Sequence, residues 1–339
     1  LYYNINRPYE ALEILKKADS NIKIDESPFE LVKLYSKIGT ILTSIDSISQ
    51  AEIYFQKGLN LANKVGDIYS SIVLKTELGY NHYKQANYSE ALKLLHEAQA
   101  SSKEYELAQL IGVQELYYGK IYETQNEFDR SIEKYSNAFQ SSGDAHDYNN
   151  QIEAAYMLGR NYESNDPAKA EEWYLTAIEI IEKISSPLSL NQEIQIAHFS
   201  GLNSVYNSLA QLYLQQGRGE DAFVIIDKSK SRNTKANLER LKLVSHFKDQ
   251  EEYNEIIDLE WMIASGLYDN SVVDSLQKVL AKIKTELVAE NKLLEKFLFD
   301  IKSKTIKDMQ EKLEENDFIV SVYIGNEFLT LFNVNSDGL

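Results

Sequence analysis

The residue types that most often carry catalysis or bind metals are either missing from this sequence or are not arranged to act together. The chain has no cysteine, which excludes disulfides, zinc–thiolate sites and cysteine nucleophiles from these residues. It contains no phosphate-binding glycine-rich loop, no Gly-x-Ser-x-Gly elbow and no His-Glu-x-x-His pair. Adjacent acids, such as Glu171 with Glu172 and Glu314 with Glu315, are typical of exposed helix surfaces. We therefore predict no catalytic residue, no metal site and no cofactor in this chain.

Bulk composition indicates a folded, acidic protein without a membrane span. Hydrophobic residues make up 43% of the 339 residues, a proportion expected of globular rather than disordered chains. The formal net charge of −17 argues against nucleic acids and acidic membrane surfaces as partners. Solubility is the simpler explanation of this charge, and a basic partner is the alternative. No run of about 18 apolar residues and no signal peptide is present, which leaves the compartment open and favours the cytoplasm.

The strongest signal in the sequence is an internal repeat. A large residue followed by glycine recurs every 40 residues, at Ile38-Gly39, Leu78-Gly79, Tyr118-Gly119 and Leu158-Gly159. Each pair is followed at fixed distances by a small residue and then by a large, mostly aromatic one: Ala51 and Phe55, Ala91 and Leu95, Ser131 and Tyr135, Ala170 and Tyr174. A shifted copy contains Leu209-Ala210, Tyr213, Ala222 and Ile226, and the first residues match the second half of an earlier copy.

This pattern resembles the tetratricopeptide repeat, in which small residues on two helices, A and B, let their axes approach closely. The resemblance implies an all-α fold, with a right-handed tetratricopeptide-like α-solenoid over residues 1–231. We expect a partial repeat at 1–30 and repeats near 32–65, 72–105, 112–145, 152–184 and 203–231. The family's period is about 34 residues, so the extra residues are expected mostly around the B-to-A connections. Ser189 to Gln216 reads as an unusually long helix A, interrupted only at Gly201.

The resemblance also implies which residues would contact a ligand, because the A helices of tetratricopeptide arrays line a concave groove. The family's groove positions correspond here to seven residues of the central repeats: Tyr80, Tyr83, Leu116, Lys120, Glu123, Tyr156 and Arg160. Aromatic residues and arginine are typical binding anchors, so we predict a protein or peptide ligand in this groove. The alternative is structural: the tyrosines bury their rings with hydroxyls toward water, and Lys120 pairs with Glu123 or a neighbour. Ser36 and Thr40 stand where a chaperone-tail clamp begins, so that particular ligand is not expected.

Two segments follow the repeats. Apolar residues at near-heptad spacing over 232–305, with a break at Ser265-Gly266, predict a long helical hairpin. In 306–339, two β-branched and aromatic runs at 317–324 and 328–334 flank Gly325-Asn326-Glu327, which predicts a short C-terminal β-hairpin. An isolated two-stranded hairpin is marginally stable. Because the sequence also starts inside a helical pattern, we expect it to be a fragment of a longer protein, cut where a sheet begins.

The order of these segments resembles the approach to a CHAT domain, a caspase-like domain associated with tetratricopeptide repeats. The resemblance lies in the Ser/Lys/Arg-rich segment from Asp227 to Leu241, in the helix pair, and in "IKDMQEKLEENDFIVSVYIGNEFLTLFNVNSDGL", Ile306 to Leu339. It implies that 306–339 is the truncated start of a CHAT-like α/β domain, and that the repeats regulate a bacterial cysteine peptidase. The peptidase His and Cys would lie beyond Leu339. The chain's own histidines sit in no CHAT motif: His82, His96, His146, His198 and His246.

Three other functions remain open. A free-standing tetratricopeptide adaptor would need no domain after Leu339. A sensor region of a bacterial signalling kinase or transcription regulator would more often continue into a membrane span or a basic DNA-binding domain. An independent enzyme is disfavoured by the lack of catalytic motifs.

Overall fold

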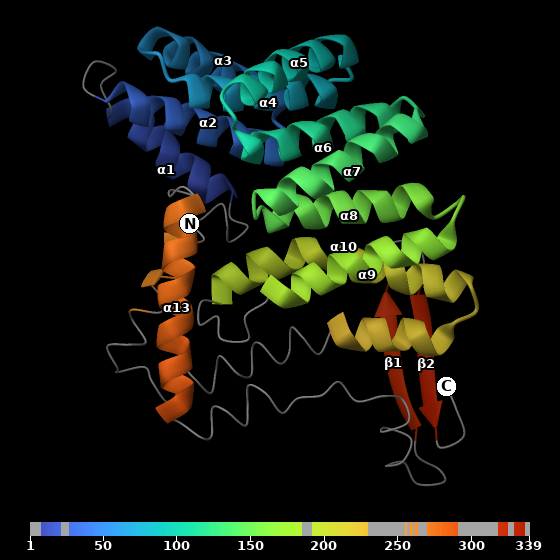
Figure 1. Ribbon diagram of the computed structural model, residues 1–339. Coiled ribbons are helices and arrows are strands. Elements are labelled where there is room, and N and C mark those ends of the chain that lie inside the picture. The colour runs from blue at the N-terminus through green and yellow to red at the C-terminus, as the bar shows by residue number, and fades with distance from the viewer. Residues whose placement is uncertain are drawn as a thin grey trace. The chain divides into compact units, whose positions relative to one another are not determined.

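The computed structural model in Figure 1 describes residues 8–21, 27–184, 192–229, 270–290, 318–324 and 329–335, with isolated positions between 255 and 263. The chain divides into two compact units, Leu1–Ile180 and Ile181–Leu339. In the described residues up to 290, every regular element is a helix. None of the described helices combines the length and apolar character that crossing a bilayer would require.

From residue 28 onward, the first unit consists of antiparallel helices joined by short turns (Figure 1). The helices at the A positions of the repeats are α2 (Pro28–Ser44), α4 (Ile68–Lys84), α6 (Ala108–Thr124) and α8 (Tyr148–Tyr162). The helices at the B positions are α1 (Pro8–Asn21), α3 (Ile48–Val65), α5 (Tyr88–Glu104), α7 (Phe128–Asp144) and α9 (Pro167–Ile184), whose last residues belong to the second unit. Each helix from α1 to α8 contacts the next, and α2, α4, α6 and α8 also contact one another in succession. The A helices therefore form one continuous layer.

Short turns with a left-handed middle residue connect the helices of the repeat. Helices α4, α5, α6 and α7 are each 17 residues long, and three-residue turns connect them. The middle residue of each turn has a positive φ, as at Ala86 (59°), Glu106 (54°) and Asn126 (61°). A left-handed residue after the last helical turn ends a helix by turning the following N–H groups back onto the last carbonyls. After α4 the left-handed residue is Ala86, and the N–H of the next residue, Asn87, donates to the carbonyl of His82 at 2.9 Å.

The residues that lengthen the repeat beyond 34 lie around the B-to-A connections, as expected, but as extensions of the helices. Helices α3, α5 and α7 continue to within two or three residues of the next A helix. The helices themselves are longer, and the A helices start at 28, 68, 108 and 148, four residues before the expected starts near 32, 72, 112 and 152. The glycine–aromatic pattern locates the helix crossing, and the crossing does not determine how far a helix continues.

The glycines of the repeat lie where helix B crosses helix A. A Cβ atom at Gly119 would overlap the ring of Tyr135, and the same is true of Gly159 with Tyr174 and Gly39 with Phe55. Leu95 covers Gly79 in the same way. The small helix B residues of the pattern are fully buried at the same crossings: Ala51, Ala91, Ser131 and Ala170. These contacts agree with the register derived from the sequence.

The second unit begins with the end of α9 and continues with α10 (Gln192–Gln215), a 24-residue helix. Helix α10 runs through Gly201 without a break, in contrast to the interruption expected there. A turn at Gly217, with φ of 73°, leads to helical residues 219–229. Leu209 and Ala210 of α10 and Ala222 of the following helix are fully buried, as expected for a shifted repeat.

Toward the C-terminus the structure describes α13 (Asn270–Glu290) and two strands, β1 (Phe318–Ile324) and β2 (Leu329–Asn335). The strands pair in antiparallel register from Phe318 with Asn335 to Ile324 with Leu329. Most of the first helix expected within 232–305, and the turn expected at 325–327, lie outside the described residues.

Candidate functional site on the A helices

The residues expected to line a groove come from three successive A helices. Tyr80 and Tyr83 lie on α4, Leu116, Lys120 and Glu123 on α6, and Tyr156 and Arg160 on α8. Leu116 is only 1% exposed and belongs to a core cluster with Tyr135 and Leu158, so it is not available to a ligand. The other six side chains are at least partly exposed. With Glu77, Tyr117 and Glu153, they form the surface called the A-helix face below.

Two stacked tyrosines link α4 to α6. The rings of Tyr80 and Tyr117 lie 4.4 Å apart between centroids, with 20° between their planes. The Lys120 ammonium lies 5.3 Å from the centroid of Tyr80 and 5.7 Å from that of Tyr117, within the range of a cation–π interaction. Tyr117 was not among the expected residues, although its position one helical turn before Lys120 places both on one side of α6.

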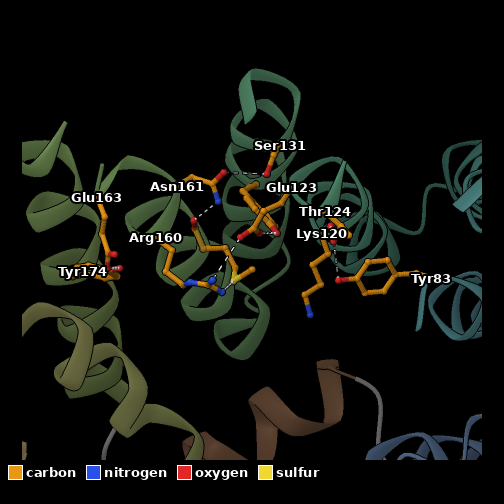
Figure 2. Close-up of polar contacts among 11 residues, drawn as sticks. Tyr83, Lys120, Glu123, Thr124, Ser131, Arg160, Asn161, Glu163 and Tyr174 are labelled. Atoms are coloured by element: carbon orange, nitrogen blue, oxygen red, sulfur yellow. Dashed lines mark hydrogen bonds and ion pairs between the residues drawn. The ribbon is translucent and has the colours of Figure 1, made fainter. Parts of the chain in front are cut away.

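Ion pairs link α6 to α8. Lys120 binds Glu153 at 2.6 Å, and Arg160 lies 3.7 Å from Glu123, as Figure 2 shows for Arg160 and Glu123. The structural alternative for Lys120, a pair with Glu123 or a neighbour, is therefore realised through Glu153. Burial alone would lower the pKa of Lys120, but Glu153 and Tyr80 outweigh it, so this pKa lies above its ordinary value. Lys120 is therefore a permanently charged, largely covered cation.

Glu77 is a further titratable group of this face that sequence reasoning missed. Burial raises the pKa of Glu77 to about 7, although hydrogen bonding to Tyr117 and the charges of Lys37 and Lys120 act in the opposite direction. Solvent still reaches part of this side chain. Near neutral pH the A-helix face therefore changes its charge with small changes in pH.

Two further tyrosine contacts join neighbouring helices at this face. The hydroxyl of Tyr83 lies 3.3 Å from Oγ1 of Thr124, which joins the C-terminal turns of α4 and α6 (Figure 2). The ring of Tyr156 lies 6.0 Å from that of Tyr174 on α9. Tyrosines thus hold successive helices together and leave part of their surface exposed.

The groups on this face are suited to binding, because it offers aromatic rings, hydroxyl groups and two charge pairs. In the part of the chain that the structure describes, no group of three or more His, Asp or Glu residues is placed to hold a metal ion.

Comparisons with known proteins identify the fold. No family model matches the sequence, and no curated protein is significantly similar to it. Among solved structures, BtubC (BKLC) from P. vanneervenii is similar with a TM-score of 0.51 and 15% identity, over 69% of this chain and 91% of that chain. NprR, crystallised in complex with its cognate peptide NprX, gives a TM-score of 0.46 and 14% identity over 83% of each chain. At 15% identity the likeness to BtubC concerns the fold alone, and together with the helix pairs of the first unit it shows that this chain has a helical-repeat fold.

Proposed function

We propose that this chain is a tetratricopeptide-type scaffold that binds a protein or peptide on its A-helix face. The observation that carries the proposal is that Tyr80 on α4, Lys120 on α6, and Tyr156 and Arg160 on α8 lie on one surface formed by three successive A helices. Aromatic residues and arginine dominate the energetics of protein interfaces, because they bury a large area and keep a polar group for orientation.

The contacts within the face also favour binding. Stacking on Tyr117 holds the ring of Tyr80, and the pairs Lys120–Glu153 and Arg160–Glu123 restrict both cations. A surface ordered before the ligand arrives loses less side-chain entropy on binding. An extended peptide crossing α4, α6 and α8 would meet a prearranged set of rings and charges.

The test is selection of peptides from a phage-displayed library on the immobilised protein, followed by affinity measurements on variants. Replacing Tyr80, Tyr156 and Arg160 together with alanine should weaken binding of the selected peptides at least about 100-fold. Truncating a single anchor residue of an interface typically costs about 2 kcal/mol or more, and two such losses among the three residues are enough for this effect. A matched control away from the A-helix face replaces exposed Tyr105, in the turn after α5, and exposed Phe128 and Arg130 on α7 with alanine, and it should leave the affinity within about twofold. Equal affinity for the A-face variant and the unchanged protein would reject the A-helix face as the binding surface.

A narrower proposal is that the repeats regulate a CHAT-type cysteine peptidase. It rests on the sequence resemblance of residues 306–339, the segment that contains β1 and β2. The check is the coding sequence after Leu339, which should continue with sheet-forming segments, a His-Gly and a later Cys. A stop codon there would favour a free-standing adaptor, and a membrane span or a basic DNA-binding domain would favour the sensor region of a signalling protein.

A further inference from the structure

A buried tyrosine of the third repeat holds a carboxylate at the surface. Tyr135 on α7 lies over Gly119 and is completely buried, and its hydroxyl donates to Oε2 of Glu123 at 2.7 Å. Burial, followed by the nearby charge of Glu123, holds the pKa of Tyr135 far above its usual range, so the hydroxyl stays a donor. One oxygen of Glu123 is thereby fixed from inside the repeat.

The other repeats differ in whether they have this contact. In the fourth repeat Tyr174 donates in the same way to Glu163 (Figure 2). In the first repeat the residue that covers the glycine is Phe55, which has no hydroxyl and is also completely buried. A phenylalanine therefore fits the position, and the tyrosine hydroxyl adds a contact to the surface without being needed for the packing.

The carboxylate held by Tyr135 faces the most exposed cation of the A-helix face. Oε1 of Glu123 lies 3.7 Å from Arg160, whose side chain is 47% exposed. Arg160 also points one nitrogen at the sulfur of Met157, 3.9 Å away, and a thioether is a weak acceptor. The guanidinium is thus oriented by a nearby charge that lies beyond hydrogen-bonding distance, with donors left for another acceptor.

An arginine whose guanidinium is oriented and has donors left can bind a carboxylate of the ligand. The planar guanidinium binds carboxylates through two parallel hydrogen bonds, which a lysine cannot do. Lys120 is less suited to this role, because it is only 16% exposed and already binds Glu153 at 2.6 Å. The anion-binding group of the face is therefore Arg160.

We propose that Tyr135 is a positioning residue, which acts through Glu123 to orient Arg160 for an Asp or Glu side chain of an acidic peptide ligand. This inference rests on the proposed function and adds to it the chemistry of the ligand. The first repeat carries Phe55 and Thr43 at the positions of this tyrosine and glutamate.

The experiment measures fluorescence anisotropy with two labelled pools of short degenerate peptides. Both pools are amidated at the C-terminus, and they differ only in a central Asp-Glu or Asn-Gln pair. The unchanged protein should prefer the acidic pool. Tyr135→Phe should reduce that preference about five- to tenfold, Arg160→Ala should abolish it, and the matched control Tyr174→Phe should preserve it. In ¹⁵N relaxation measurements, the Arg160 Nε–H group should become more mobile in Tyr135→Phe and stay unchanged in Tyr174→Phe.

The remaining outcomes separate the two proposals. The positioning role would be overturned if Tyr135→Phe kept the full preference for the acidic pool while Arg160→Ala lost it. It would also be overturned if Tyr174→Phe reduced this preference as much as Tyr135→Phe does. In both cases the A-helix face would stand as the binding surface. Equal binding of both pools by the unchanged protein would overturn this inference and leave the proposed function standing. Binding of neither pool would overturn both this inference and the proposed function.

Discussion

Gly119 has no room for a side chain, since the ring of Tyr135 occupies the place of a Cβ atom. The backbone of Gly119 is helical, so conformational freedom does not explain the glycine. Close approach of the two helices explains it: the ring from helix B lies directly on the backbone of helix A. Gly39 and Gly159 have the same relation to Phe55 and Tyr174.

At this scale we predict that Gly119→Leu lowers the free energy of unfolding by about 1–3 kcal/mol, because the added side chain overpacks the crossing. Denaturant unfolding followed by circular dichroism measures the change. Ala108→Leu serves as a control, since Ala108 is the exposed first residue of the same helix and should tolerate leucine within about 0.5 kcal/mol. An unchanged midpoint for Gly119→Leu would contradict the proposed packing.

At the scale of the helices, polar contacts join A helices that are 40 residues apart in the sequence. Glu77 on α4 interacts with Tyr117 and Lys120 on α6, and Lys120 in turn binds Glu153 on α8. A carboxyl group enclosed in this way carries a cost when it ionises, because burial disfavours its charged form more than the nearby cations favour it.

We therefore predict that the stability of the folded chain depends on pH through the ionisation of Glu77. Its pKa is about 7 in the folded chain against 4.5 for an ordinary glutamate. A raised carboxyl pKa gives a contribution to stability that is fully present below pH 4.5 and is lost as the pH rises through 7. The loss should be about 2 kcal/mol, less than the pKa difference alone implies, because solvent reaches part of the side chain.

Denaturant unfolding at several pH values tests this dependence. Glu77→Gln should remove the decline and make the chain more stable than the unchanged protein above pH 7, whereas Glu133→Gln, at an exposed site on α7, should keep the decline. Parallel profiles for the unchanged protein and Glu77→Gln would show that another group titrates.

At the scale of the whole molecule, charge is the dominant feature. The chain has 52 acidic and 35 basic residues. Several of its ion pairs are exposed and lie within one turn of a helix, as in Lys17–Glu13 and Lys93–Glu90. Such pairs contribute little to stability. Repulsion among the excess acids opposes the folded state, because folding brings them closer together.

We therefore predict that added salt stabilises this protein. Raising the sodium chloride concentration from about 0.02 M to about 0.3 M shortens the screening length from roughly 20 Å to roughly 6 Å, which weakens the long-range repulsion. Scanning calorimetry should show a melting temperature that rises by a few degrees over this range. A fall would mean that attractive ion pairs outweigh the repulsion.

Much of the fold could be derived from the sequence because its signals are local and repeated. The large residue–glycine pair recurs four times and is followed each time by a large side chain, aromatic in three copies and Leu95 in the other, so the sequence alone locates each helix crossing. The ends of the helices were not located as well, since a left-handed turn can be made by Ala86, Glu106 or Asn126, which carry no common sequence signal.

The sequence and the tertiary structure each determined part of the candidate site. Helical periodicity and the family's groove positions identified the outward side of each A helix, and therefore Tyr80, Lys120 and Arg160. Only the tertiary structure showed that Leu116 is buried and that Glu77 lies among charges of neighbouring helices. The physical reason is that periodicity describes how a side chain is oriented about its own helix. Burial, pairing and pKa depend on the distance and angle at which the next helix packs, and these follow from the side chains of both helices at once.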